Sequence, residues 1–164
     1  MPAGKEGRAV PSSQPDADKG LFDLKRFLPY LLNRAGIRLA TAFSAELSRF
    51  DLTLPMWRVM AVLWHHGEQR VTDLVIETTI EQSTLSRLLA SMDGRGLVAR
   101  QRNQRDARTV IVRLTPAGRD LTRQLIPLAL RNEGTALQGF SPQEIDALHT
   151  MLFRIFDNAA ELLD

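Results

Sequence analysis

The sequence contains no cysteine among its 164 residues, so neither disulfide bonds nor thiolate metal ligands are available to it. No apolar run approaches the ~18 residues that a transmembrane helix requires, and the first residues lack the charged-then-apolar pattern of an export signal. A Gly-rich phosphate loop, a nucleophile–base motif and a paired-carboxylate signature are missing as well. These absences favour a cytoplasmic protein that acts by binding, and we expect no enzymatic activity and no cofactor.

Lysine is scarce, since arginine supplies 18 of the 21 basic residues, and the formal net charge of +2 is unevenly distributed. Seven arginines and two aspartates lie between Arg87 and Arg113, a local net charge of +5. Residues 115–164 hold four arginines and seven acids, a local net charge of −3. A basic segment beside an acidic one is typical of an edge that binds a polyanion, although a solvated charged surface has the same composition.

The two ends of the chain differ in pattern. Residues 1–19 hold three of the eight prolines and few apolar residues, which predicts a disordered tail. From residue 21 to about residue 50, apolar residues recur every three or four positions, which predicts a long helix that Pro29 either kinks or restarts. Two further helices are expected over residues 116–163, the second opening at Ser141.

The middle of the chain begins with two helices. Thr53 is expected to cap the first, Pro55 fits its first turn, and Gly67 ends it. A short helix is expected over residues 72–78. The segment that follows these two helices is the most informative part of the sequence.

That segment predicts a third helix with a polar beginning. Thr79, with Gln82 three residues later, indicates a capping box, and Gly94 and Gly96 indicate the helix end. One apolar stripe runs along it, formed by Leu85, Leu88, Leu89 and Met92. Five polar residues lie off the stripe in the first turns, namely Gln82, Ser83, Thr84, Ser86 and Arg87.

A short helix followed by a helix with a polar amino-terminal half is typical of a helix-turn-helix. The major groove of DNA, ~12 Å wide, admits one α-helix, whose first side chains meet the base edges. Arginine can bind guanine with two hydrogen bonds, glutamine can pair with adenine, and hydroxyls can bind phosphates or bases. A solvated helix face would have the same polar pattern, so the next segment is needed to decide between them.

The next segment predicts a β-hairpin with a basic loop. Residues 97–102 and 109–114 read as its two strands. A hairpin after a helix-turn-helix is a wing, and arginines on a wing can enter the narrow minor groove. The hairpin holds four of them before its second strand, Arg100, Arg102, Arg105 and Arg108. Asp106 either pairs with Arg108 to orient its guanidinium or forms the turn.

The segment VTDLVIETTIEQSTLSRLLASMDGRGLVARQRNQRDARTVIVRLTPAGRDL resembles the winged-helix core of the MarR family of bacterial transcription regulators. The matching motifs are SMDGRGLV at the helix end, the Asp-x-Arg of Asp106 and Arg108, and RLTPAGR. The resemblance implies a mainly α fold with a two-stranded β-wing, in a MarR-type domain over residues 20–164. It further implies a winged helix-turn-helix over about 54–115 and dimerisation helices over about 21–50 and 116–163.

By this resemblance Arg87 belongs to the recognition helix and Arg108 to the wing tip that enters the minor groove. Two positions depart from the family pattern. Ala107 stands where the family often has a second arginine, which leaves wing affinity to Arg102 and Arg105. The turn segment ETTIEQ lacks the glycine that many members carry there.

The ends of the chain also predict a homodimer. Their apolar faces are wider than a winged helix of ~70 residues can cover, so burial against a second copy is expected. These faces comprise Leu21, Phe27, Leu28 and Leu31 at one end and Leu148, Leu152, Phe153 and Phe156 at the other. Two-fold symmetry then predicts a pseudo-palindromic operator with half-sites about one helical turn apart.

The resemblance implies, in addition, a pocket for a small aromatic or phenolic effector between the dimer helices and the DNA-binding lobe. Candidate lining residues are Arg34, Arg38, Phe43, Trp57, Met60 and His65. The apolar members at helical spacing are equally consistent with core packing, and the arginines with solvated surface. His65 and His66 are adjacent, so their side chains point ~100° apart on a helix and cannot chelate one metal ion.

The sequence thus predicts a ligand-responsive DNA-binding regulator that acts as a repressor, located in the cytoplasm at the bacterial nucleoid. The alternative is a helical dimeric interaction protein whose winged helix binds protein instead of DNA, although such a wing has little need of a +5 segment. The candidate DNA-binding residues are Thr72, Gln82, Ser83, Thr84, Ser86, Arg87, Arg100, Arg102, Arg105, Asp106 and Arg108.

Overall fold

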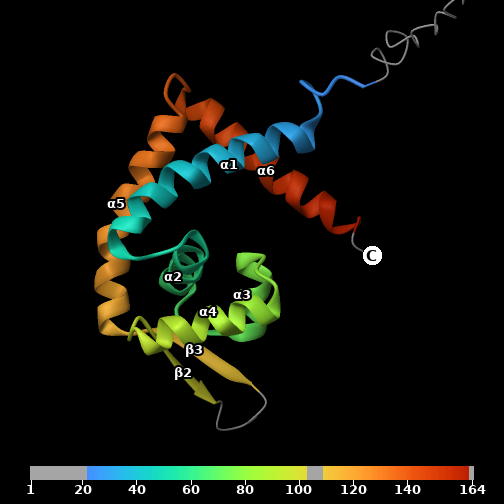
Figure 1. Cartoon of the computed structure of the whole chain (residues 1–164). Coiled ribbons are helices and arrows are strands. Elements are labelled where there is room, and N and C mark those ends of the chain that lie inside the picture. The colour runs from blue at the N-terminus through green and yellow to red at the C-terminus, as the bar shows by residue number, and fades with distance from the viewer. Residues whose placement is uncertain (1–21, 103–108, 163–164) are drawn as a thin grey trace, which may run out of the picture. The chain divides into compact units, whose positions relative to one another are not determined.

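The computed structural model describes residues 22–102 and 109–162, and within these ranges it contains six α-helices and three short strands (Figure 1). The helices are α1 (Leu28–Leu47), α2 (Leu54–His66), α3 (Val71–Thr78), α4 (Gln82–Gly94), α5 (Pro116–Ala136) and α6 (Pro142–Ala160). A 3-10 turn, η2 (Ser48–Phe50), follows α1, and the strands are β1 (Gln69–Arg70), β2 (Val98–Arg102) and β3 (Val110–Leu114). The predicted disordered tail, residues 1–19, lies outside the described residues.

The chain divides after Ile37 into two compact units, and α1 runs through the division. In the first unit, the rings of Phe22 and Phe27 pack edge to face with their centroids 5.0 Å apart. The helix begins at Leu28 instead of residue 21, because Pro29 fits only the first turn of a helix, where its missing N–H is not needed. Of the two predicted effects of this proline, the restart is the one observed.

Local capping signals set the ends of the other helices. The Thr53 side chain accepts a hydrogen bond from the backbone N–H of Met56 at 3.4 Å, and Gly67 ends α2 with a φ of 79°. Ser141 and Glu144 form a reciprocal capping box at the start of α6. These starts and ends were predicted from the sequence and are confirmed.

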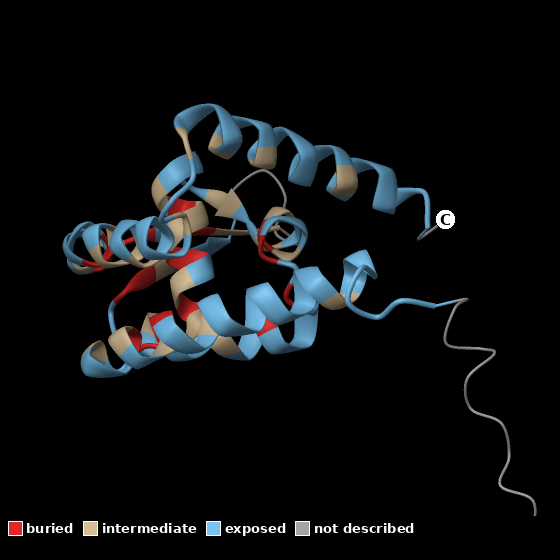
Figure 2. Ribbon diagram, turned by 90° about the horizontal axis from the view of Figure 1, so that it is seen from above, coloured by how far each residue is buried: buried red, intermediate tan, exposed pale blue. Residues whose placement is uncertain are grey.

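The second unit holds one hydrophobic core, which lies among α2, α3, α4 and β3 and also takes in the end of α1 and one turn of α5 (Figure 2). Its fully buried members include Leu47, Met60, Leu74, Leu85, Met92, Val112 and Leu125. In contrast, α6 has no buried residue at all. No helix in the described part of the chain is long and apolar enough to cross a membrane.

The sheet has three antiparallel strands in the order β1-β3-β2. The predicted hairpin is confirmed, with Arg100 opposite Val112 and Ala99 opposite Arg113. Because side chains alternate along a strand, Val112 and Arg113 face opposite sides of the sheet. The third strand, β1, was not predicted, since two residues are too few to show any alternation.

The carboxyl end of α4 is fixed by two sets of contacts. Gly96 and Leu97 donate backbone hydrogen bonds to Asp93 and Met92 at 2.8 and 2.9 Å, which is the Schellman closure of a helix. The Arg95 side chain reaches across to the turn before α2, where its Nη1 donates to the carbonyl of Asp51 at 2.6 Å. The end of α4 is thus attached to the turn that precedes α2.

The motif LTPAG joins the hairpin to α5 through a close backbone approach. The Thr115 hydroxyl donates to the carbonyl of Gly96 at 2.6 Å and accepts from the N–H of Gly118 at 3.0 Å. A Cβ atom added at Gly118 would lie 2.0 Å from the carbonyl oxygen of Leu97. Only glycine therefore allows the first turn of α5 to rest on the start of β2.

We expect Gly118→Ala to lower the free energy of unfolding by about 3 kcal/mol, because the backbone of Leu97 must move to admit the methyl group. The matched control is Gly134→Ala in the same helix, where an added Cβ meets nothing within 4 Å. That substitution should raise stability by about 0.5–1 kcal/mol through helix propensity. Denaturant unfolding at one fixed chain concentration compares the two, and equal effects would contradict the close approach.

Candidate DNA-binding surface

The turn between α3 and α4 differs from the prediction. Thr79 has a left-handed backbone with a φ of 53° and donates its N–H to the carbonyl of Ile76 at 3.4 Å. It therefore ends α3 and does not begin α4. The predicted capping box of Thr79 and Gln82 is wrong, because a residue that caps a helix start needs an extended backbone. Glu81 has that conformation, with a φ of −56° and a ψ of 140°.

Glu81 caps α4 with its side-chain carboxylate, a role that the sequence reasoning missed. The carboxylate accepts hydrogen bonds from the backbone N–H groups of Ser83 and Thr84 at 2.9 and 3.1 Å and from the Ser83 hydroxyl. These bonds, the one from the hydroxyl above all, lower the pKa of Glu81 from 4.5 to about 2. A fixed negative charge thus lies at the amino end of α4, and the first free N–H groups of the helix are occupied.

The predicted polar face of α4 is exposed as a whole. Leu85, Leu89 and Met92 are buried against the core, whereas all five predicted reading residues are exposed, namely Gln82, Ser83, Thr84, Ser86 and Arg87. The Ser86 hydroxyl donates to the carbonyl of Gln82 at 2.9 Å, which leaves its lone pairs available to a ligand. Arg87 forms no hydrogen bond or ion pair with any described residue.

A hollow of about 270 Å³ brings four of the candidate residues together. Thr72 comes from α3, Gln82 and Ser86 from α4, and Arg100 from β2, so helix-turn-helix and hairpin share one surface. Arg70 of β1 also lines this hollow and was not among the candidates. Its position between the predicted helices gave no signal, because the strand that carries it was not foreseen.

Two wing arginines have different surroundings. Arg100 Nε lies 3.1 Å from Asp93 Oδ2, an ion pair that connects β2 to the last turn of α4. Arg102, at the end of β2, is exposed and forms no ion pair within the described ranges. The other three wing candidates, Arg105, Asp106 and Arg108, lie outside the described residues, as does the expected pair between the last two. Their roles stay predictions.

The six candidate effector residues are distributed over several environments. Phe43 is buried and packs edge to face on Trp57 with ring centroids 5.3 Å apart, and Met60 is fully buried. His65 is exposed with its ring against His66. Arg38 is exposed. The guanidinium of Arg34 lies 5.3 Å from the ring centroid of Tyr30 and donates to its hydroxyl at 3.3 Å. Their binding role remains a prediction.

Known proteins share this fold and sequence pattern. Residues 41–125 match the family described as transcriptional regulator SarA/Rot. A MarR family transcriptional regulator from Silicibacter pomeroyi is 32% identical, with a TM-score of 0.77 over 85% of this chain and 94% of its own. BpsR of Bordetella bronchiseptica, whose DNA binding is regulated by 6-hydroxynicotinic acid, is 28% identical, with a TM-score of 0.75 over 83% and 97%.

A further relative, the HTH-type transcriptional repressor NicR of Pseudomonas putida, is 26% identical over 151 residues, which are 92% of this chain and 95% of NicR. The fold and these relatives are those of transcription regulators and not of enzymes.

We expect Glu81→Gln to lower stability at neutral pH and to change its dependence on acid. Since the pKa of this carboxyl falls on folding from 4.5 to about 2, its contribution is complete above pH 4.5 and is lost as the pH falls toward 2. Thermal unfolding at a series of pH values should therefore show a gap between the two proteins that closes over this range. The pKa of Glu144 is also lowered, by hydrogen bonds from Ser141, but this group is common to both proteins and cancels.

The matched control for this experiment is Glu77→Gln, an exposed acid at the end of α3 that caps no helix. Its difference from the unmodified protein should not follow the same curve. A gap for Glu81→Gln that persists unchanged down to pH 2 would show that the carboxylate does not cap α4.

Proposed function

Because the chain belongs to the MarR family of winged helix-turn-helix transcriptional regulators, we propose that it is a repressor that binds a pseudo-palindromic operator as a homodimer and is released by a small aromatic or phenolic effector. Family membership establishes a DNA-binding transcription regulator. The repressor role, the dimer and the effector are the proposed part.

The observation that carries the proposal is the exposed polar face of α4. One helix fits the major groove, and side chains at its amino end meet base edges there. Gln82, Ser86 and Arg87 occupy the first two turns of α4 and are exposed. Arg70 adds positive charge beside Gln82 and Ser86, which favours a phosphate contact at the edge of the groove.

Exposed apolar side chains support the homodimer. On α6, Met151, Phe153 and Phe156 are 52%, 70% and 66% exposed, and in the first half of α1 Leu28 and Leu31 are 45% and 44% exposed. Solvated monomers rarely leave so much apolar surface uncovered on neighbouring turns of a helix. A second copy of the chain supplies the same kind of surface, and closed two-fold pairing is the commonest way to bury it.

Two relatives support the effector and the repressor role. NicR is named a repressor, and 6-hydroxynicotinic acid, an aromatic carboxylic acid, regulates DNA binding by BpsR. In this chain the half-buried Trp57, whose ring packs edge to face on the buried Phe43, offers aromatic surface, and the exposed Arg38 offers a cation for the carboxylate. An effector that binds better to a dimer whose recognition helices no longer match the operator shifts the population to that dimer.

We expect Arg87→Ala to lose discrimination at one base position of the operator, at a cost of ~1–3 kcal/mol, because a bidentate contact to guanine is lost. Binding to DNA from the protein's own promoter region, measured by fluorescence anisotropy over a range of salt concentrations, gives both affinity and discrimination. Arg131→Ala on α5, also exposed, is the matched control and should bind as the unmodified protein does.

The same titration separates the alternatives. A loss that is uniform across sequences would make Arg87 a phosphate contact instead of a base contact. Affinity that does not fall with salt would favour the protein-binding alternative. A stoichiometry of one chain per operator would contradict the homodimer.

We also expect an aromatic carboxylate such as 6-hydroxynicotinic acid to lower operator affinity, and Arg38→Gln to raise the required concentration about tenfold, because a charge-assisted hydrogen bond is lost. Competition in the anisotropy assay measures this, with Arg131→Gln as the control. If aromatic acids and phenols leave the operator complex intact, the effector proposal fails while DNA binding stands.

A further inference from the structure

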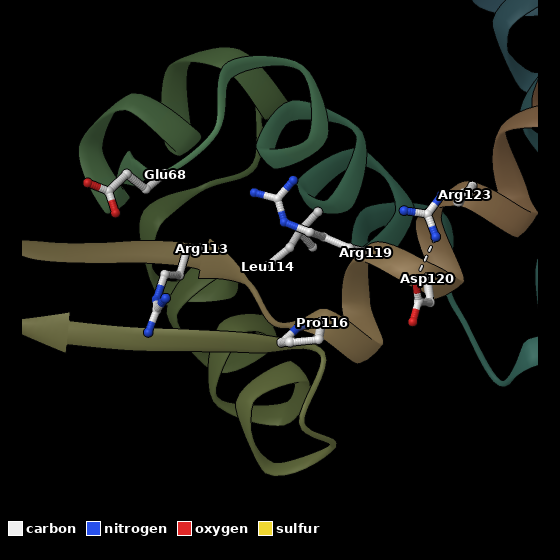
Figure 3. A pocket seen from close by; sticks show the side chains of 7 residues that line it. All are labelled: Glu68, Arg113, Leu114, Pro116, Arg119, Asp120 and Arg123. Atoms are coloured by element: carbon white, nitrogen blue, oxygen red, sulfur yellow. Dashed lines mark hydrogen bonds and ion pairs between the residues drawn. The ribbon is translucent and has the colours of Figure 1, made fainter.

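A second cavity, of about 500 Å³, opens at the junction of β3 and α5 (Figure 3). Arg113 and Leu114 reach it from β3, Pro116 and Arg119 from the start of α5, and Glu68 from the connection between α2 and β1. None of these residues belongs to the DNA-binding candidates or to the candidate effector set. A volume of this size is in the range of sites for small organic ligands.

The cavity carries cations that the described residues leave unpaired. Asp120 is neutralised by Arg123, whose Nη1 lies 2.6 Å from Asp120 Oδ1. Arg113 and Arg119 form no ion pair with any described residue. In Figure 3 the Arg119 side chain extends from α5 toward the side of Glu68, whereas the Arg113 guanidinium points away from it, across β2. A planar guanidinium with free donors is suited to bind a carboxylate or a phosphate.

The floor of the cavity is apolar. Leu114, which is 5% exposed and belongs to the core, and Pro116, which is exposed at the start of α5, both line it. An inorganic ion would leave these surfaces in contact with water. A ligand with a small apolar body beside its anionic group would cover them and gain from their burial.

The cavity also lies away from the surface that reads DNA. Arg100 is paired with Val112, and its ion pair with Asp93 places it beside α4. Arg113 is the next residue after Val112, so its side chain leaves the opposite face of the sheet. A cation on that face is poorly placed for a phosphate of the operator and is accessible to a free ligand.

We propose that this cavity, with Arg119 and Arg113 at its rim and Leu114 and Pro116 at its floor, is a binding site for a small organic anion, separate from the effector site of the regulator. The anionic group, a carboxylate or a phosphate, binds the guanidinium of Arg119, and the apolar body rests on Leu114 and Pro116. The proposal does not depend on the identity of the effector or on the operator.

Phenyl phosphate is a suitable probe, since it combines a phosphate with a small ring. Calorimetry at low salt should detect its binding to the full chain, and Arg119→Gln should weaken that binding about tenfold. Arg131→Gln, which removes an exposed arginine farther along the same helix, should leave it unchanged. Equal affinities of the two variants would overturn the proposal, as would an inorganic phosphate that binds as tightly as phenyl phosphate.

The indole NMR signals of the two tryptophans can show where the ligand binds. Trp64 lies under Arg123 at the cavity, with the guanidinium carbon 5.9 Å from its ring centroid, whereas Trp57 packs on Phe43 in the candidate effector set. In a ¹H–¹⁵N spectrum, phenyl phosphate should shift the indole signal of Trp64 and not that of Trp57. A shift of Trp57 alone would assign the probe to the effector site and overturn the separate cavity.

Alternatively, Arg119 could bind a phosphate of the DNA backbone. Operator binding by Arg119→Gln distinguishes this source, because a DNA contact would lower affinity and reduce its salt dependence. We expect operator affinity equal to that of Arg131→Gln. A loss confined to Arg119→Gln would make the occupant a DNA phosphate and overturn the small anion.

Discussion

The close approach of Gly118 to the carbonyl of Leu97 brings the first turn of α5 against the backbone between α4 and β2. Leu97 follows the glycine that ends α4 and precedes β2, so one backbone position joins the recognition helix, the wing and α5. Thr115 closes the same junction with bonds to both sides. The placement of α5 against the end of α4 and the hairpin therefore depends on this close approach.

Elements whose signals are local were predicted well. Thr53 and Ser141 cap their helices as expected, because a cap depends on a side chain and a few backbone groups near it. The prediction that Thr79 caps α4 was wrong for a physical reason. Thr79 and Glu81 lie in the same turn, and the side chain of either can cap a helix. The packing of α3 on α4 decides which of the two has an extended backbone. The two-residue strand β1 is defined entirely by its pairing with β3.

The candidate DNA-binding surface was likewise predicted where its signal is local and missed where it depends on tertiary contacts. The polar face of α4 follows from the apolar stripe, since whatever is not buried must face outward. The partners of that face did not follow from the sequence. Arg70 and the Asp93–Arg100 pair are brought to it by tertiary contacts between segments that carry no joint signal. Composition showed that the region is basic, and only the fold shows which arginines are already paired.

The Arg95 bond to Asp51 gives the recognition helix two unequal ends. At its carboxyl end α4 is fastened to another part of the fold, whereas its amino end is held mainly by the carboxylate of its own neighbour, Glu81. Gln82 and Ser83, which we propose to contact base pairs, lie at this amino end, next to the carboxylate that caps it.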